Sequence, residues 1–333
     1  MNRSSALPFP AVDAYPPAVT ADLYRVESRL AELARSSREP RLTEITHHLI
    51  SAGGKRVRPL AALLVFHACA PPGKDARRDD MTKVATALEL IHSATLLHDD
   101  IIDGSDRRRG RASALRTFGM ADTLVAGDFV FCRAFELCAG FEERVVRWAA
   151  DACVSLTEGE MLQSRLRSNP AVTVDDYLEI IARKTASLFR QGARVAAYLA
   201  GAEEVIQDVA AETGHHIGMA FQIIDDLLDV VGQPSVTGKP TSADLRDGNP
   251  SLPIVLALER DPEVRRLFGK AALDDQEIAH TIDRIQASGV LATVQARADD
   301  HVAVALDQLR LLPDTPARQA LAALARGIAT RSL

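Results

Sequence analysis

The chain has 333 residues, and its 39 Lys and Arg against 45 Asp and Glu leave a formal net charge of −6 at pH 7. This acidic balance argues against a nucleic-acid-binding protein, which usually carries a basic excess or a basic face. The length exceeds that of a small disulfide-stapled scaffold. Hydrophobic residues make up 47% and aromatic residues only 5%. Because Ala, Leu and Arg dominate and are good helix formers, the composition favours an all-α protein.

Helical periodicity is nearly continuous after a proline-rich start. Residues 1–20 lack the apolar run of a signal peptide, so we expect a flexible tail there and one domain over 21–333. The pattern predicts helices over 22–37, 42–52, 59–70, 80–103, 121–140, 143–168, 173–200 and 203–231. A long loop over 232–249 follows, and then shorter helices with breaks near Asp261, Asp274 and Pro313. Long helices joined by short loops predict a single-domain helical bundle.

The cysteines and the apolar runs bear on the compartment. Cysteines at 69, 132, 138 and 153 lie in apolar, helix-like stretches without a CxxC pair, so we expect buried, reduced thiols. No apolar run approaches the roughly 20 residues that cross a bilayer. We therefore expect a cytoplasmic protein without a transmembrane segment, and peripheral contact with a membrane stays open.

One acidic pattern, DDxxD, occurs twice, each time after an apolar helical run. The two triplets are Asp99, Asp100, Asp103 and Asp225, Asp226, Asp229. Residues three and four apart share a helix face, so each triplet makes one carboxylate patch. Such like charges repel unless a cation neutralises them. Carboxylates without His or Cys partners favour hard cations, and Mg²⁺ in particular where phosphates share the coordination.

The alternative interpretation of each triplet is a solvated acidic helix end. Apolar pairs flank both triplets, among them Leu96-Leu97 and Ile223-Ile224. Such flanks indicate helices with several buried faces, which argues against the solvated alternative.

Basic segments supply the complementary charge. GGKRVRP at 53–59 places cations at a glycine turn before a helix, and RRRGR at 107–111 follows the first acidic triplet. Lys184 lies within a predicted helix, and Lys239 lies in the predicted loop after the second triplet. The chain has no P-loop motif, so a nucleoside triphosphate is not indicated. The pattern instead predicts a pocket for two diphosphates, bridged by Mg²⁺.

The order and spacing of these motifs match a known family. The chain resembles the trans-isoprenyl diphosphate synthases, or polyprenyl synthetases, over roughly residues 40–260, and looks most like the long-chain all-trans polyprenyl diphosphate synthases. The matching segments are GGKRVRP at 53–59, IHSATLLHDDIID at 91–103, RRG at 108–110, GD at 127–128, EGE at 158–160, KT at 184–185, FQIIDDLLD at 221–229 and GKP at 238–240.

This resemblance implies an all-α isoprenoid synthase fold around a deep central cavity, a homodimer, and a requirement for Mg²⁺ with up to three ions. The implied reaction is the head-to-tail (1′-4) condensation of isopentenyl diphosphate onto an allylic diphosphate, with release of diphosphate. The motifs assign isopentenyl diphosphate to Lys55, Arg58, His92 and Arg109. They assign the allylic diphosphate to Arg108, Lys184, Thr185, Gln222 and Lys239, and the metal to all six aspartates. The implied catalytic set is Asp99, Asp103, Lys184, Thr185, Gln222, Asp225 and Lys239.

Two positions depart from the family pattern. Many relatives carry Lys where Asn249 stands, and Ser242 replaces a frequent Gly. The loss of that Lys removes one proposed diphosphate contact and puts the details of the allylic site in doubt. His98 stays open between a site role and an ordinary helix histidine.

The residues before the first triplet bear on product length. In this family the growing chain passes this part of the helix, and short-chain synthases usually place an aromatic residue where Ala94 and Thr95 stand. One helical turn is about 5.4 Å, close to one extended isoprene unit, so small residues predict a longer cavity. Ile91, Phe131 or Phe135 would then form its floor, although ordinary core packing explains each equally well. We predict a product of C30 or longer, with a geranylgeranyl diphosphate synthase (C20) as the alternative.

Two other classes remain. A class I terpene cyclase would share the first triplet but would lack GGKRVRP and the second triplet. A non-catalytic regulatory subunit of a heteromeric synthase would tend to lose the aspartates, and both triplets are intact.

Overall fold

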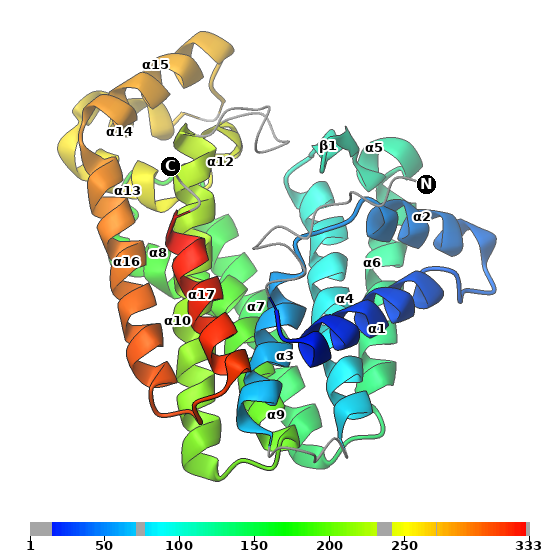
Figure 1. Ribbon diagram of the computed structural model, residues 1–333. Helices are drawn as coiled ribbons and strands as arrows, with labels where there is room; N and C mark the ends of the chain where they lie inside the picture. Colours follow the sequence, from blue (N-terminus) through cyan, green and yellow to red (C-terminus); the bar gives the residue numbers. More distant parts are fainter. Residues whose placement is uncertain (1–14, 71–76, 232–241, 271, 331–333) are drawn as a thin grey trace. The chain divides into compact units, whose positions relative to one another are not determined.

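The computed structural model describes residues 15–70, 77–231, 242–270 and 272–330 (Figure 1). Within these residues helices are joined by turns and loops, and the only strands form one short hairpin, β1 (Arg107–Arg108) and β2 (Arg111–Ala112). The all-α prediction is confirmed. In the same part of the chain, no helix is both long enough and apolar enough to cross a membrane.

The chain divides into two compact units. The first comprises 1–150, 189–214 and 308–324, and the second comprises 151–188, 215–307 and 325–333. Helices wholly within the first unit are α1 (Pro17–Leu33), α2 (Pro40–Ser51), α3 (Val57–Cys69), α4 (Arg78–Ile102), α5 (Ala114–Phe118) and α6 (Met120–Cys138). The second unit holds α8 (Val174–Ile181), the π-helix η2 (Ala182–Ala186), α12 (Ala243–Asp247), α13 (Leu252–Arg260), α14 (Pro262–Phe268) and α15 (Asp275–Ala287). Five helices contribute to both units: α7 (Glu143–Leu166), α9 (Ser187–Leu199), α10 (Glu204–Val231), α16 (Val290–Leu309) and α17 (Pro316–Ala329).

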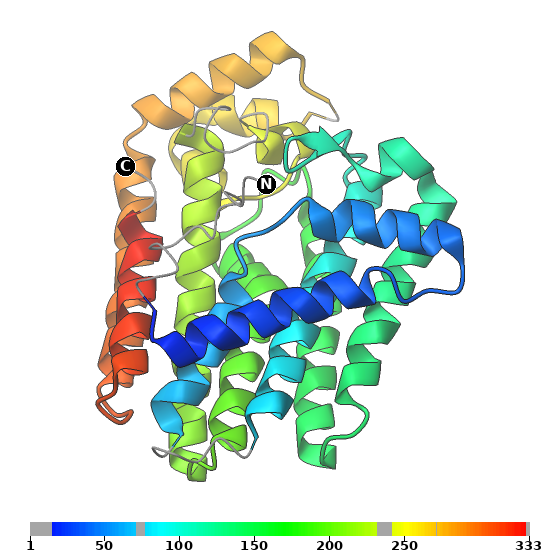
Figure 2. The same ribbon diagram turned by 45° about the vertical axis from the view of Figure 1, so that its right-hand side comes forward.

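In the first unit, α4 packs along α6, and α1 lies across α3 and α4 (Figure 2). A buried carboxylate ties these helices together. Asp22 of α1 is fully buried and accepts hydrogen bonds from His67 of α3 at 2.8 Å and from Arg78 of α4 at 2.7 Å. Since a charged acceptor strengthens hydrogen bonds, this contact fixes α1 on the helix that carries the first acidic triplet.

Several boundaries differ from the sequence prediction. The first helix begins at Pro17 rather than at residue 22, because proline suits a first helical turn and Val19 is buried. Residues 1–14 of the expected tail lie outside the described residues. Thr173 and Asp176 form the expected capping box, but the helix predicted over 173–200 contains the π-turn η2. The predicted loop was wrong in its last part, where residues 243–247 form α12.

The prediction for the cysteines was partly wrong. All four are free thiols, but Cys132 is exposed and Cys69 is half-buried, whereas Cys138 and Cys153 are buried. Because α6 is amphipathic and is covered on one side only in the first unit, a cysteine in an apolar stretch there can still face outward.

Candidate active site

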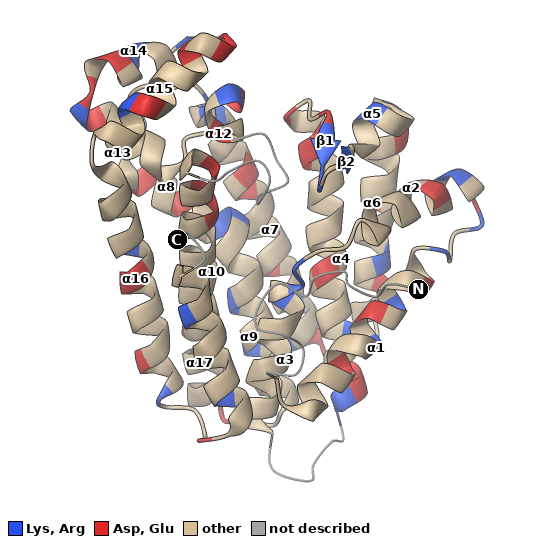
Figure 3. Ribbon diagram, turned by 45° about the horizontal axis from the view of Figure 1, so that its top comes forward, with Lys and Arg blue, Asp and Glu red and all other residues tan. Residues whose placement is uncertain are grey.

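The first acidic triplet lies at the end of α4. Asp99 and Asp100 belong to its last turn, and Asp103 is its C-cap residue. Asp100 is fully buried and accepts from Arg108 of β1, whose Nε lies 2.8 Å and whose Nη2 lies 2.7 Å from Oδ1. Burial raises the pKa of Asp100, while Arg108 opposes this rise. Figure 3 shows the acidic end of α4 beside the basic hairpin. The predicted diphosphate ligand Arg108 therefore lies at the first triplet.

A second group of cations gathers at the turn before α3. Gly54 lets two guanidinium groups approach its backbone, because a Cβ there would lie 2.6 Å from Nη1 of Arg56 and 2.9 Å from Nη2 of Arg109. Arg58 stacks over the ring of Phe189 at 5.1 Å. Burial lowers the pKa of His92 well below its usual value, and the charges of Arg58 and Arg109 lower it further. The neutral imidazole and the arginines thus form a site suited to an anion.

Two other candidate residues of the first unit are Lys55 and His98. Lys55 is exposed in the same turn. His98 fills the space above Gly127, where a Cβ would lie 2.2 Å from its Nε2, and it is 3.5 Å from Asp128. This contact explains the GD motif at 127–128 by packing, so the ordinary role for His98 is supported.

In the second unit, the second triplet ends α10. Asp226 is buried and accepts from Gln222 Nε2 at 2.8 Å and from the Leu252 N–H at 3.4 Å. Burial raises the pKa of Asp226 to about 7. The Tyr177 phenol is buried beside it, and burial together with Asp226 raises the pKa of Tyr177 well above its usual value.

The outer aspartates of this triplet are half-buried. The carboxylate of Asp229 accepts from the N–H groups of Ala243 at 3.1 Å and Asp244 at 3.0 Å. It therefore holds the first turn of α12 in the way that a capping residue does.

Lys184 and Thr185 lie in the π-helix η2, a rare geometry that is frequent at functional sites. Thr185 donates to Gln222 Oε1 at 2.8 Å, so that a hydrogen-bonded chain runs from Thr185 through Gln222 to Asp226. Lys184 forms an ion pair with Glu160 of α7. The structure thus brings Lys184, Thr185 and Gln222 to the second triplet's unit and connects two of them to Asp226.

Sequence reasoning gave no role to three residues that hold these groups: Arg56, Glu160 and Tyr177. The first two stood inside recognised motifs, so the motifs themselves were the signal. Tyr177 carried no signal, because its proximity to Asp226 depends on the packing of α8. Lys239 lies outside the described residues.

The two departures have structural counterparts. Ser242 has φ +70°, a left-handed conformation that favours glycine, which explains why glycine is frequent there. Asn249 is buried and its Oδ1 accepts from Gln163 at 3.0 Å. The amide at 249 is thus engaged within the second unit.

Oxygen ligands dominate both triplets, and this donor set fits Mg²⁺, which keeps several waters and shares its shell with substrate phosphates. Both contacts from Arg108 reach Oδ1 of Asp100, and Oδ2 of this carboxylate is buried. No group of three or more described His, Cys, Asp or Glu residues already converges as a metal cage. The aspartates therefore fit a metal whose shell is completed by a ligand.

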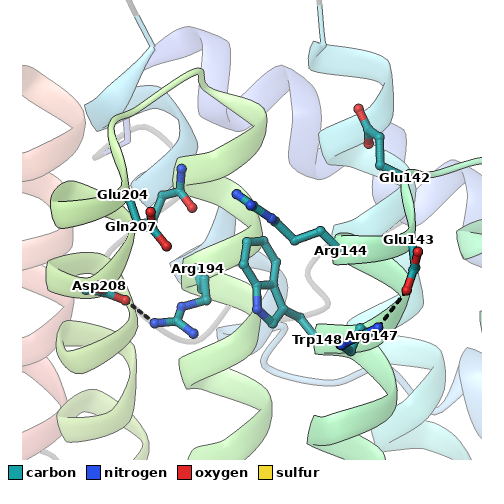
Figure 4. A pocket seen from close by; sticks show the side chains of 9 residues that line it. All are labelled: Glu142, Glu143, Arg144, Arg147, Trp148, Arg194, Glu204, Gln207 and Asp208. Carbon is teal, nitrogen blue, oxygen red and sulfur yellow. Dashed lines mark hydrogen bonds and ion pairs between the residues drawn. The ribbon is translucent and has the colours of Figure 1, made fainter.

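The described residues also form a hollow of ≈ 530 Å³ in the first unit, lined by parts of α7, α9 and α10 (Figure 4). Arg194 pairs there with Asp208, and Arg147 pairs with Glu143 at 2.6 Å. No predicted site residue lines this hollow. Because two of its three arginines already pair with carboxylates and the third, Arg144, lies over the Trp148 ring, the hollow is less suited to a diphosphate than the turn before α3.

The described part of the chain is an all-α fold with one short hairpin, and it carries two aspartate triplets, one of them beside basic residues. These are features of a metal-dependent enzyme acting on diphosphates. Residues 39–286 match the family model for polyprenyl synthetase. The chain belongs to this family, and it is a trans-prenyltransferase with the isoprenoid synthase fold. The family uses divalent metals, and its substrates are isopentenyl diphosphate and an allylic diphosphate.

Relatives with different names are about equally similar. An octaprenyl diphosphate synthase of Escherichia coli is 34% identical over 289 residues, covering 85% of this chain and 88% of that protein. A short chain isoprenyl diphosphate synthase of Methanothermobacter thermautotrophicus is 36% identical over 312 residues, covering 90% and 93%. The crystal structure of a polyprenyl synthase from Caulobacter crescentus, complexed with calcium and isoprenyl diphosphate, has a TM-score of 0.90 at 33% identity and covers 97% of this chain and 98% of its own.

Proposed function

We propose that residues 21–333 act as one catalytic domain that makes an all-trans polyprenyl diphosphate of C30 or longer. The observation that carries this proposal is the small size of the two side chains on α4 that lie five and four residues before Asp99. Ala94 is fully buried, and Thr95 is half-buried with its hydroxyl donating to the His92 carbonyl at 2.8 Å. Ile91, about one helical turn earlier in the sequence, is 4% exposed. No aromatic side chain stands at either 94 or 95 to block a growing prenyl chain.

In the proposed mechanism, Lys55, Arg58, His92 and Arg109 hold isopentenyl diphosphate. The leaving diphosphate of the allylic substrate is held by Arg108, Lys184 and Lys239. When bound, Mg²⁺ at the two aspartate triplets, up to three ions, supplies further positive charge for this leaving group. The hydroxyl of Thr185 and the amide of Gln222 place oxygen dipoles near the developing allylic cation. The allylic C–O bond breaks, which releases diphosphate and leaves the allylic cation. Attack by the double bond of isopentenyl diphosphate forms the new C–C bond, and the resulting cation loses a proton to the released diphosphate.

The alternative is a geranylgeranyl diphosphate synthase with a C20 product, and the short-chain relative at 36% identity favours it. Identity alone does not decide between the two lengths, because the octaprenyl synthase is 34% identical. The size of residues 94 and 95 therefore carries the choice.

We further propose a homodimer. Three large apolar side chains of α6 are exposed, Met120 by 63%, Leu124 by 48% and Val125 by 54%. An apolar face of this kind on one helix is typical of a protein interface. The cytoplasmic location expected from the sequence stays a prediction.

The test is incubation of the purified chain with Mg²⁺, isopentenyl diphosphate and allylic primers of several lengths, with products separated by chromatography. We expect the wild type to give C30 or longer. Ala94→Phe should shorten the product, because a ring there would block the path. Since Ala94 is fully buried, the half-buried Thr95→Phe serves as a second variant that strains the core less. If the wild type stops at C20, or if both folded variants keep the wild-type length, the proposal is refuted.

A further inference from the structure

Arg56 is a buried cation with two carboxylate partners. It is 4% exposed and joins the turn before α3 to two helices of the first unit. Its Nε lies 2.6 Å from Oε1 of Glu27 on α1, and its Nη1 lies 2.6 Å from Oε1 of Glu89 on α4. A planar guanidinium can serve both carboxylates at fixed angles, which an ammonium group cannot do. Arg56 therefore cross-links α1, the turn and α4.

The backbone at Arg56 is unusual as well. Its φ is +50°, a left-handed conformation that is rare for a residue with a side chain. Such backbone persists only where the surroundings hold it, and it is concentrated at functional sites. Here the two ion pairs are the contacts that hold it.

The neighbours of Arg56 are the cations of the candidate isopentenyl diphosphate site. Both the Arg56 and the Arg109 guanidinium groups lie against Gly54, at 2.6 Å and 2.9 Å from the position of an added Cβ. Burial lowers the pKa of Arg109, the charge of Glu89 opposes this, and the charge of Arg56 adds to it. Glu89, itself 2% exposed, thus balances charge for Arg56 and for Arg109 together.

We propose that Arg56 is a positioning residue for isopentenyl diphosphate. The Glu27–Arg56–Glu89 bridge holds the left-handed backbone at Arg56, so that Lys55, just before it, and Arg58, in the first turn of α3, are presented on the same anion site as Arg109. This inference rests on the proposed function, because it takes the assignment of Lys55, Arg58 and Arg109 from there. Arg56 itself is turned into the protein, toward its two glutamates, and does not touch the substrate.

A buried ion pair is weak evidence for stability, because the cost of removing both charges from water offsets their attraction. A bridge of this kind is better explained by specificity of geometry. Removing it would release the turn, and the ligands of one substrate would lose their alignment. The allylic diphosphate is held by other residues, so its binding should be affected little.

The experiment compares Arg56→Met and Arg56→Lys with a matched control, Arg78→Met. Arg78 also links α4 to α1, through the buried Asp22, but it lies eleven residues before Glu89, or about 16 Å along the helix. Steady-state kinetics with each substrate varied in turn, normalised to the active enzyme, give KM for both diphosphates and kcat. Thermal unfolding measures the purely structural effect.

For Arg56→Met we expect KM for isopentenyl diphosphate to rise about tenfold or more, as for the loss of one charge-assisted hydrogen bond, with the allylic KM within about twofold. The KM of Arg56→Lys for isopentenyl diphosphate should lie between those of the wild type and Arg56→Met, because lysine keeps the positive charge but lacks the planar set of guanidinium donors. Arg78→Met should lower the unfolding temperature and leave both KM values unchanged. If Arg56→Met does not fold, Glu27→Gln replaces it, since Glu27 is 41% exposed and the variant keeps the size of the side chain.

Equal changes in both KM values, or a pattern like that of Arg78→Met, would overturn the inference. So would a lower KM for isopentenyl diphosphate in Glu89→Gln, since Glu89 would then act only as a repelling charge. Arg58→Met distinguishes a failure of the site assignment from a failure of the positioning role. If Arg58→Met leaves KM for isopentenyl diphosphate unchanged, the site assignment in the proposed function fails. If Arg58→Met raises this KM but the Arg56 variants leave it unchanged, only the positioning role of Arg56 fails.

Discussion

Gly159 of α7 offers a sharp test of how the second unit holds Lys184. A Cβ added at Gly159 would lie 2.6 Å from the backbone nitrogen of Lys184 and 2.9 Å from Cβ of Arg183. Both contacts involve the π-turn η2, which carries Lys184 and Thr185. Gly159→Ala therefore pushes α7 and the π-turn apart, at the point where Glu160 pairs with Lys184.

The size of the effect follows from these distances. A contact of 2.6 Å is about 0.8 Å shorter than ordinary van der Waals contact, and the partner is backbone, which has little freedom to move. Overpacking of this kind costs about 1–3 kcal/mol, and alanine in a helix returns about 1 kcal/mol relative to glycine. The net loss of stability is therefore at most about 2 kcal/mol, which for a chain of this size corresponds to about 3 °C in the unfolding temperature. A shift approaching 1 Å in a catalytic group, in contrast, costs roughly 10- to 100-fold in rate.

We therefore expect a large loss of kcat with a small loss of stability. The assay measures prenyl transfer at saturating concentrations of both diphosphates, together with thermal unfolding of the same samples. The matched control is Gly140→Ala, because a Cβ at Gly140 would meet no atom within 4 Å. That variant should keep wild-type kcat and unfolding temperature.

The reasoning is refuted if Gly159→Ala keeps kcat within about twofold of wild type while Gly140→Ala behaves as expected. The reasoning also fails if a large fall of the unfolding temperature accompanies the loss of kcat. General destabilisation would then explain the loss, and displacement of Lys184 would not be needed.

Three further predictions concern stability and reactivity. Ser242→Gly should raise the free energy of unfolding by up to about 1 kcal/mol in urea titrations, because it relieves the left-handed backbone at φ +70°. The pKa of His301 is lowered to about 4, by burial and then by the neighbouring His216. The unfolded state therefore binds more protons below its ordinary pKa near 6.5, so stability should fall from about pH 6.5 towards pH 4 by about 1–2 kcal/mol after allowance for partial exposure. In His301→Gln, the urea concentration at the midpoint of unfolding should change less with pH over that range than in the wild type. The same dependence on pH in both proteins would contradict the assignment to His301. In the dissociated chain, a disulfide reagent at pH 8 should label the exposed Cys132 first, because burial raises the pKa of Cys69 to about 12; Cys132→Ser should remove this fast phase, and the proposed pairing of α6 in a homodimer should slow it.

The sequence was sufficient for the features that depend on local order and spacing. Helix type and most boundaries followed from periodicity, and the capping box at Thr173 and Asp176 was read directly. The aspartate triplets were found because spacing along one helix fixes which carboxylates are neighbours. The family also followed from motif order, and the match over 39–286 confirms it.

Features that depend on packing between helices could not be predicted. The π-turn at Lys184 leaves no mark in the periodicity, and neither does the close approach of α7 to it at Gly159. The exposure of Cys132 depends on which side of α6 is covered, and apolar neighbours in sequence do not determine this. Likewise, Glu27 and Glu89 are distant in sequence from Arg56, and only the fold makes them its partners.

The two acidic triplets share one pattern of burial, and helix geometry explains this pattern. In each triplet the second aspartate is buried, Asp100 at 0% and Asp226 at 6% exposure, while the first and last are half-buried. Successive residues are rotated by about 100° around a helix, so the second position turns toward the core when the first and fifth face outward. Each buried carboxylate then needs donors from the protein, and finds them in Arg108 or in Gln222 and the Leu252 N–H. The middle aspartate thus anchors the helix end to its surroundings, which leaves the outer pair as the better placed ligands for a metal.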